Sequence, residues 1–200
     1  FHSAEYLVDQ IAWMERQFDI DSVYFTDSTI GNNRKLIAAF SELMIRRGLA
    51  DRVEWHANIR PNQVTEDLLR LMWRAGCRFR FYGFESGSQR VLDVMAKGCK
   101  AADNDRAAAL HEKLKFPYHA SMLLGFPGER EDDIQETLAF MRRHAPPSLG
   151  VNWYVPLPGS PDYDQLKAVG ALDIADPHLW RRIGEVNGAR VYADVDERRF

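Results

Sequence analysis

This chain of 200 residues has few cysteines, little net charge and no long apolar run, and each of these features excludes a class of protein. Two cysteines, Cys77 and Cys99, cannot build a disulfide framework, so we expect a reducing compartment, the cytoplasm. Lys and Arg total 26 against 29 Asp and Glu, a formal net charge of −3, which argues against nucleic acid as a partner. No apolar run approaches the ~18 residues of a membrane-spanning helix, and no signal peptide opens the chain, so we expect no membrane partner.

The residues that are abundant indicate a folded domain with alternating strands and helices. Hydrophobic residues make up 46% of the chain, which is enough to bury a core in one domain. The expected strands cover about residues 22–28, 52–60, 78–86, 118–125 and 151–155. The expected helices cover about residues 3–18, 33–47, 65–75, 89–96, 102–114 and 131–144. This regular alternation predicts β-α-β units and a parallel sheet.

The alternation of side chains within the strands indicates what kind of sheet this is. In the second expected strand Trp55 and Ala57 share one face, whereas His56, Asn58 and Arg60 share the other. A doubly wound sheet is covered on both faces and carries apolar residues throughout. One polar face therefore favours an open or incomplete β/α barrel, although a sheet with one uncovered face would give the same alternation.

The expected strand ends carry glycine and small polar or charged residues. Ligands of parallel β/α proteins bind at the carboxyl ends of the strands. Glycine at such a place permits close approach of the backbone to a ligand. The strand ends are Asp27-Ser28, Asn58-Ile-Arg60, Glu85-Ser-Gly87, Gly125-Phe-Pro-Gly-Glu129 and Pro156-Leu-Pro-Gly-Ser160. Their joint placement predicts one binding rim.

At these strand ends the sequence resembles the radical S-adenosylmethionine enzymes, most closely the cobalamin-dependent branch. The resemblance is carried by residues 23–29 (VYFTDST), 83–98 (GFESGSQRVLDVMAKG), 124–129 (LGFPGE) and 156–161 (PLPGSP), and it covers roughly residues 5–163. It implies a partial six-stranded β/α barrel, of which residues 1–163 lack the first strand, followed by an extension over residues 164–200. The sequence pattern of that extension predicts a helix near residues 177–183. The resemblance further implies S-adenosylmethionine, a 4Fe-4S cluster and, through an upstream domain, cobalamin as cofactors.

The resemblance also implies a reaction and a set of contacts. The reaction is methyl transfer or a radical rearrangement on a small-molecule substrate, with a reductant such as flavodoxin or ferredoxin. Residues 26–28 match the segment whose backbone receives the methionine amino group, and Lys97 matches a contact to the carboxylate. Asn58 and Ser121 match ribose contacts, and residues 123–126 with 155–156 match adenine contacts. The expected cofactor-binding residues are Thr26, Asp27, Ser28, Asn58, Glu85, Ser86, Lys97, Ser121, Leu123, Gly125, Phe126, Val155 and Pro156.

One departure from the family limits what these 200 residues can do. The family holds its cluster with a C-x3-C-x2-C loop after the first barrel strand, and both the loop and that strand are missing here. We expect Cys77 and Cys99 to be ordinary thiols, the cluster loop to lie upstream of residue 1, and the 200-residue piece alone to be inactive. A non-catalytic barrel that lost the loop and serves as a binding or scaffold module is the alternative. An unrelated barrel hydrolase or aldolase is less favoured, because no lysine or His/Asp metal set lies at the strand ends.

Three further polar residues carry open interpretations. His56 and His119 share the polar face, and we expect hydrogen-bonded interior residues rather than a metal pair. Arg60 either clamps a substrate carboxylate or forms an ion pair with Glu54 or Glu85.

Overall fold

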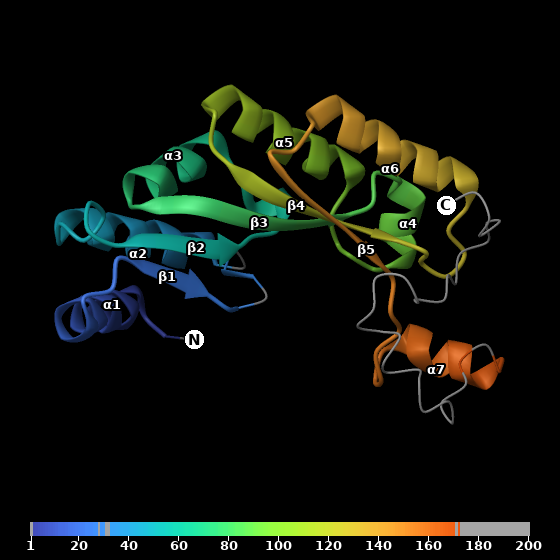
Figure 1. The fold of residues 1–200 in the computed structure, drawn as a ribbon, viewed down its shortest axis with the longest axis horizontal. Helices are drawn as coiled ribbons and strands as arrows, with labels where there is room; N and C mark the ends of the chain where they lie inside the picture. The colour runs from blue at the N-terminus through green and yellow to red at the C-terminus, as the bar shows by residue number, and fades with distance from the viewer. Residues whose placement is uncertain (1, 28, 31–32, 171, 173–200) are drawn as a thin grey trace.

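The computed structural model describes residues 2–27, 29–30, 33–170 and 172. Within these ranges one parallel sheet has the strand order β1-β2-β3-β4-β5 (Figure 1). The strands are β1 (Ser22–Phe25), β2 (Glu54–Asn58), β3 (Cys77–Glu85), β4 (Tyr118–Leu124) and β5 (Ser148–Trp153). The helices are α1 (Ala4–Phe18), α2 (Arg34–Arg46), η2 (Pro61–Gln63), α3 (Glu66–Arg74), α4 (Gln89–Val94), α5 (Ala101–Leu114), α6 (Glu131–His144) and α7 (Pro161–Ala168). The predicted α/β class with a parallel sheet is confirmed.

Local sequence explains where most of these helices begin. The side chains of Ser3, Asn33 and Thr65 each accept a hydrogen bond from a backbone N–H three residues ahead, at the starts of α1, α2 and α3. Helix α6 carries three acidic residues in its first turn and three basic ones in its last, which suits the helix dipole. These signals place the helix starts within a residue or two of the predicted positions.

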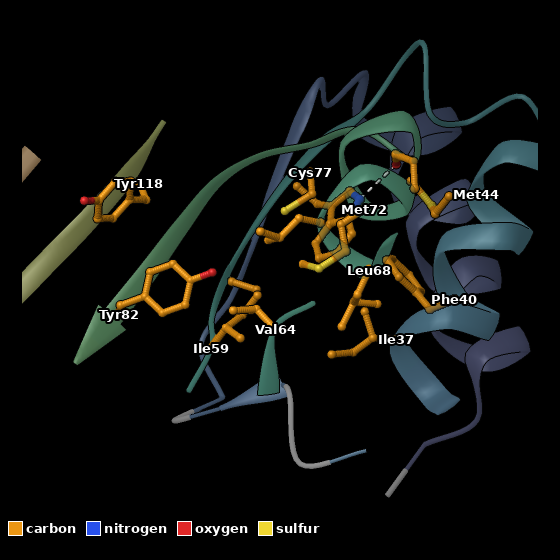
Figure 2. Packing of buried hydrophobic residues seen from close by; sticks show 14 of the residues in the cluster. Ile37, Phe40, Met44, Ile59, Val64, Leu68, Met72, Cys77, Tyr82 and Tyr118 are labelled. Atoms are coloured by element: carbon orange, nitrogen blue, oxygen red, sulfur yellow. Dashed lines mark hydrogen bonds between the residues drawn. The ribbon is translucent and has the colours of Figure 1, made fainter. Parts of the chain in front are cut away.

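The two faces of the sheet differ in burial, as the alternation predicted. On the face covered by helices, side chains are buried at 0–1% exposure, as in Trp55, Ala57, Tyr118 and Ala120. On the opposite face, which we call the inner face, residues such as His119 are half-buried. Figure 2 shows residues of this covered layer, drawn from helices and strands alike. The indole nitrogen of Trp55 donates to the backbone oxygen of Ala75 at 2.9 Å, which leaves no polar group unpaired on that ring.

Two polar side chains also lie in the covered layer. The Tyr82 hydroxyl lies 2.9 Å from Nε2 of His111, and Nδ1 of His111 lies 2.9 Å from the Phe116 carbonyl. Burial, with a contribution from Arg80, lowers the pKa of His111 to about 3, so the ring is neutral and donates from one nitrogen while accepting at the other. This arrangement satisfies a buried histidine without a charge.

Some predicted boundaries were wrong. Strand β5 runs from Ser148 to Trp153 rather than over 151–155, because Ser148 and Gly150 pair with His119 and Ser121 of β4 despite their weak strand propensity. Strand β1 ends at Phe25, three residues earlier than expected.

The segment after β5 contains a helix that the sequence analysis did not predict. Helix α7 crosses the expected boundary at residue 163 and lies beyond the carboxyl end of β5 (Figure 1). The expected helix near 177–183 lies outside the described residues, so the division at 163 stays a prediction. Within the part of the chain that the structure describes, no helix has the length and hydropathy needed to cross a membrane.

Candidate functional site

A cavity of about 410 Å³ lies on the inner face of the sheet, near the carboxyl ends of the strands. Asn58, Glu85, Lys97 and Ser121, four of the predicted site residues, line it together. The lining residues are Thr29, Asn58, Ile59, Arg60, Phe81, Tyr82, Gly83, Glu85, Lys97, His119 and Ser121. Side chains far apart in the sequence thus meet in one hollow, as expected for strand ends of a parallel sheet.

The cavity contains an ion pair between Glu85 and Lys97. Nζ of Lys97 lies 2.5 Å from Oε1 of Glu85, and the two side chains are 24% and 21% exposed. The pair lies over Gly83, where an added Cβ would come within 2.3 Å of the Glu85 carboxylate and 3.0 Å of Nζ. A register shift between Gly83 and Glu85 interrupts the regular pairing with β4, and Glu85 has a φ of +63°. The strained backbone at Glu85 aims its carboxylate back over the glycine.

Asn58 connects the cavity to the end of β1. Its Nδ2 donates to the backbone oxygen of Asp27 at 2.8 Å, and its Oδ1 accepts from the Tyr24 hydroxyl at 3.0 Å. The Asp27 backbone is thereby held beside the cavity. We infer that Asn58 orders the end of β1 in addition to facing any ligand.

Arg60 lies at the rim, and neither predicted ion pair forms among the described residues. Its Nη1 donates to the Lys97 carbonyl at 3.3 Å. Glu54 pairs with Arg78 instead, and Glu85 pairs with Lys97. The guanidinium therefore adds a positive charge to a rim where the Glu85–Lys97 pair is already neutral overall.

The two inner-face histidines are each held by a serine. Nδ1 of His119 lies 2.8 Å from the Ser148 hydroxyl, and Nε2 of His56 lies 3.1 Å from the Ser22 hydroxyl. Within the described ranges, no group of three or more His, Cys, Asp or Glu side chains is arranged to hold a metal ion. The interpretation of both histidines as hydrogen-bonded interior residues fits these contacts.

Glu129 fixes the loop that follows β4, a role that the sequence analysis missed. Its Oε2 accepts from the Gly125 backbone N–H at 2.6 Å, and the side chain is buried. Burial raises the pKa of Glu129, although the bonds from the Gly125 and Phe126 backbone act in the opposite direction. The Gly-x-Pro-Gly-Glu motif could have indicated this role, because its glutamate follows its first glycine by four residues and bonds to that glycine.

Ser86 has a structural environment instead of a place in the cavity. It is fully buried, and its hydroxyl lies 3.0 Å from that of Thr137 in α6 and accepts from the Ser88 backbone N–H. The neighbouring Gly87 packs so closely on α6 that an added Cβ would lie 2.6 Å from the Glu136 carbonyl. Ser86 and Gly87 thus hold α6 against the end of β3.

The other predicted residues that the structure describes are not part of the cavity lining. Phe126, beyond the end of β4, packs edge-on against Tyr154 with ring centres 4.7 Å apart. Ser28 lies outside the described residues. Among the described residues, the cavity lining does not include Thr26, Asp27, Leu123, Gly125, Phe126, Val155 or Pro156.

Both cysteines are buried, and neither faces the cavity. Burial raises the pKa of the Cys77 thiol to about 11, and its Sγ lies 3.9 Å from the Phe79 carbonyl. A thiol with such a pKa is protonated at neutral pH and is a poor metal ligand. The prediction of ordinary thiols fits this geometry.

Comparison with known proteins gives relatives and one family. The chain is 26% identical over 142 residues to an uncharacterised methyltransferase of Pyrococcus horikoshii, covering 71% of this chain and 30% of the relative. It is 29% identical over 163 residues to the anaerobic magnesium-protoporphyrin IX monomethyl ester cyclase of Cereibacter sphaeroides, covering 80% and 27%. The chain thus spans less than a third of the length of these relatives.

The fold matches a solved structure with a bound cofactor and cluster. The radical S-adenosylmethionine methyltransferase TsrM of Kitasatospora setae, solved with cobalamin and a [4Fe-4S] cluster, superposes with a TM-score of 0.70 at 20% identity, covering 78% of this chain and 30% of that one. The predicted β/α barrel fold is therefore confirmed. The model of the radical SAM superfamily matches residues 1–141, and this chain belongs to that superfamily.

Proposed function

We propose that this chain supplies the S-adenosylmethionine- and substrate-binding part of a radical enzyme, in which Glu85 and Lys97 hold the methionine portion. The observation that carries the proposal is the 2.5 Å ion pair between them in the cavity. The amino acid end of S-adenosylmethionine carries both an ammonium group and a carboxylate group. The ammonium group can therefore pair with Glu85 in place of Lys97, and the carboxylate with Lys97 in place of Glu85. Glu85 then receives the ammonium group and Lys97 the carboxylate.

The remaining polar groups suit a nucleoside. Asn58 and Ser121 offer amide and hydroxyl groups to ribose, while the loop fixed by Glu129 offers the backbone of Gly125 and the ring of Phe126 to adenine. Ser86 has no contact role in this arrangement because its hydroxyl is buried against Thr137. When bound, S-adenosylmethionine supplies an activated methyl group or a carbon radical, and the protein holds it in place.

The cluster does not fit the residues present. A site that leaves one iron open needs three thiolates, and the sequence holds two cysteines, both buried. We propose that the cluster ligands lie outside these 200 residues, and that the 200-residue piece alone is inactive. We further propose a cobalamin-dependent protein that transfers methyl groups or rearranges a small-molecule substrate, reduced by a flavodoxin or ferredoxin. The likeness to TsrM, a methyltransferase solved with cobalamin, supports the methyl transfer and the cobalamin. The same cysteine count also suits a non-catalytic binding module, and a three-cysteine loop in the native reading frame would exclude that alternative.

Equilibrium dialysis with radiolabelled S-adenosylmethionine and the full-length protein tests the proposal. Glu85→Gln and Lys97→Met each remove one charge that the ligand would meet, and we expect at least tenfold weaker binding. Lys113→Met is the matched control, since Lys113 pairs with Glu66 on the exposed surface at 2.6 Å. Equal affinity in all four proteins would refute the proposed site.

A further inference from the structure

A second hollow lies on the same inner face, toward the amino ends of the strands. This groove of about 600 Å³ is lined by Tyr24, His56, Arg78, Phe79, Phe81 and Pro117. The rings of Phe79 and Phe81 lie 5.1 Å apart edge to face, and Tyr24 meets Phe81 at 5.3 Å. Three aromatic rings from β1 and β3 thus line it.

The groove continues directly from the cavity. Alternate residues of β3 point to the inner face, so Phe79, Phe81, Gly83 and Glu85 follow one another toward the carboxyl end. Phe81 lines both hollows, and its ring lies 5.7 Å from that of His119 in the cavity. The lining therefore changes from charged to apolar along a single strand, with Phe81 at the boundary.

The chemistry of the groove selects against charge. Arg78 is its charged side chain, and that guanidinium is already engaged, because Nη1 donates to the Trp73 carbonyl at 2.7 Å and Nε lies 3.5 Å from Glu54. The groove is also open to solvent at Tyr24, whose side chain is 49% exposed. Aromatic faces exposed to solvent beside a polar cavity are typical of a ligand site.

We propose that this groove binds a planar, apolar and uncharged body of the substrate, beside S-adenosylmethionine in the cavity. The assignment rests on the proposed function, since a nucleoside that fills the polar cavity leaves the groove as the adjoining space. Edge and face contacts with Phe79, Phe81 and Tyr24 would orient a flat ring system.

Binding of N-phenyl-1-naphthylamine, a neutral planar probe whose fluorescence rises in apolar sites, tests the groove in the full-length protein. We expect the probe to bind together with saturating S-adenosylmethionine. Phe79→Ser should weaken probe binding at least fivefold and leave S-adenosylmethionine binding unchanged. Leu149→Ser is the control, because Leu149 is an apolar strand residue that is exposed on the other face of the sheet. Where Phe79→Ser does not fold, Phe79→Leu keeps an apolar side chain without the ring and should still weaken binding about threefold.

Three results would overturn the assignment. Probe binding that is absent, or equal in the Phe79 and Leu149 variants while S-adenosylmethionine still binds, means that another segment or partner covers the groove. Displacement of the probe by S-adenosylmethionine means that both hollows belong to one ligand. Probe binding that depends on Phe79 in a protein that binds no S-adenosylmethionine refutes the proposed function and, with it, the substrate role of the groove.

Discussion

At the scale of single residues, glycine at position 83 leaves the space that the Glu85–Lys97 ion pair occupies. The atoms that an added Cβ would meet are the ends of two flexible side chains and not backbone. The fold can therefore accept a methyl group there, whereas the ion pair cannot stay where it is. A substitution at position 83 should therefore affect ligand binding more than it affects stability.

Gly83→Ala should weaken S-adenosylmethionine binding at least tenfold because the carboxylate and ammonium groups must move apart or aside. The free energy of unfolding should change by less than about 1 kcal/mol, since no backbone is displaced. Equilibrium dialysis and urea unfolding measure the two quantities. Gly150→Ala is the control, because its Cβ also points to the inner face but would meet His119, at 3.1 Å from Nε2. Equal losses of binding in both variants would contradict the role given to Gly83.

Sequence reasoning located some of these residues and not their contacts. Glu85 and Lys97 were found by resemblance, but a pattern cannot show that a register shift and a positive φ turn Glu85 over Gly83. The resemblance also named Ser86, but it could not show that the Ser86 hydroxyl is buried against Thr137 of α6. Glu129 was recognised only as the last residue of a motif, and the folded loop is needed to show its bond to Gly125.

At the scale of elements, Asp133 joins α4 to α6. It accepts from the Ser88 hydroxyl at 2.6 Å and from the Arg130 backbone N–H at 2.8 Å, and it forms an ion pair with Arg90. Burial alone would raise the pKa of Asp133, but the bonds from Arg90, Ser88 and Arg130 lower it to about 2. The folded state therefore favours the carboxylate, which stabilises the contact above pH 4 and loses that stabilisation as the pH falls from about 4 to 2.

Asp133→Asn should lower the free energy of unfolding at pH 7 by about 2 kcal/mol, the value that corresponds to a pKa of about 2 against the usual 3.8. The difference between variant and wild type should shrink as the pH falls below 4. Urea unfolding followed by tryptophan fluorescence measures it in the full-length protein. Asp132→Asn, an exposed neighbour in the same helical turn, should have little effect. A loss at pH 7 that persists unchanged at pH 3 would show that packing, not charge, carries the contact.

Elements with strong local signals were predictable. The bounds of α6 agree with the prediction at both ends, because acidic residues, an apolar stripe and basic residues mark them. Helix α7 was missed although Ser160 caps it and Pro161 opens it, a signal that could have been used. The start of β5 was not predictable from propensity, since its first three residues, Ser148-Leu-Gly150, become a strand through pairing with β4.

At the scale of the whole molecule, the proposed function requires a cluster held by residues other than Cys77 and Cys99, which are both buried. In the full-length protein, the double variant Cys77→Ala, Cys99→Ala should keep its iron content and visible absorbance after anaerobic reconstitution with iron and sulfide. Residues 1–200 alone should form no stable visible charge-transfer band. Iron analysis and absorbance measure both. A stable band in the 200-residue chain, or loss of iron from a folded double variant, would place a cysteine of this chain among the ligands.

The architecture was more accessible to sequence reasoning than the site was. Alternation in residues 53–60 separated the covered face from the open one, because burial on one side forces a period of two. It could not reveal that the open face divides into a charged and an aromatic hollow, since that depends on which strands lie side by side and in what register. Phe79 and Phe81 are apolar residues that nevertheless lie on the open face.

The separation of the two faces has a consequence for how such a protein diversifies. Residues that are buried in the core, such as Trp55 and Tyr118, alternate along each strand with residues that line the two hollows, such as His56 and His119. A point substitution can therefore alter what is recognised without disturbing the hydrophobic layer behind it. An insertion or deletion of one residue within a strand would exchange the two roles at once, so new specificities within this architecture should arise by substitution inside strands and by length variation confined to the loops.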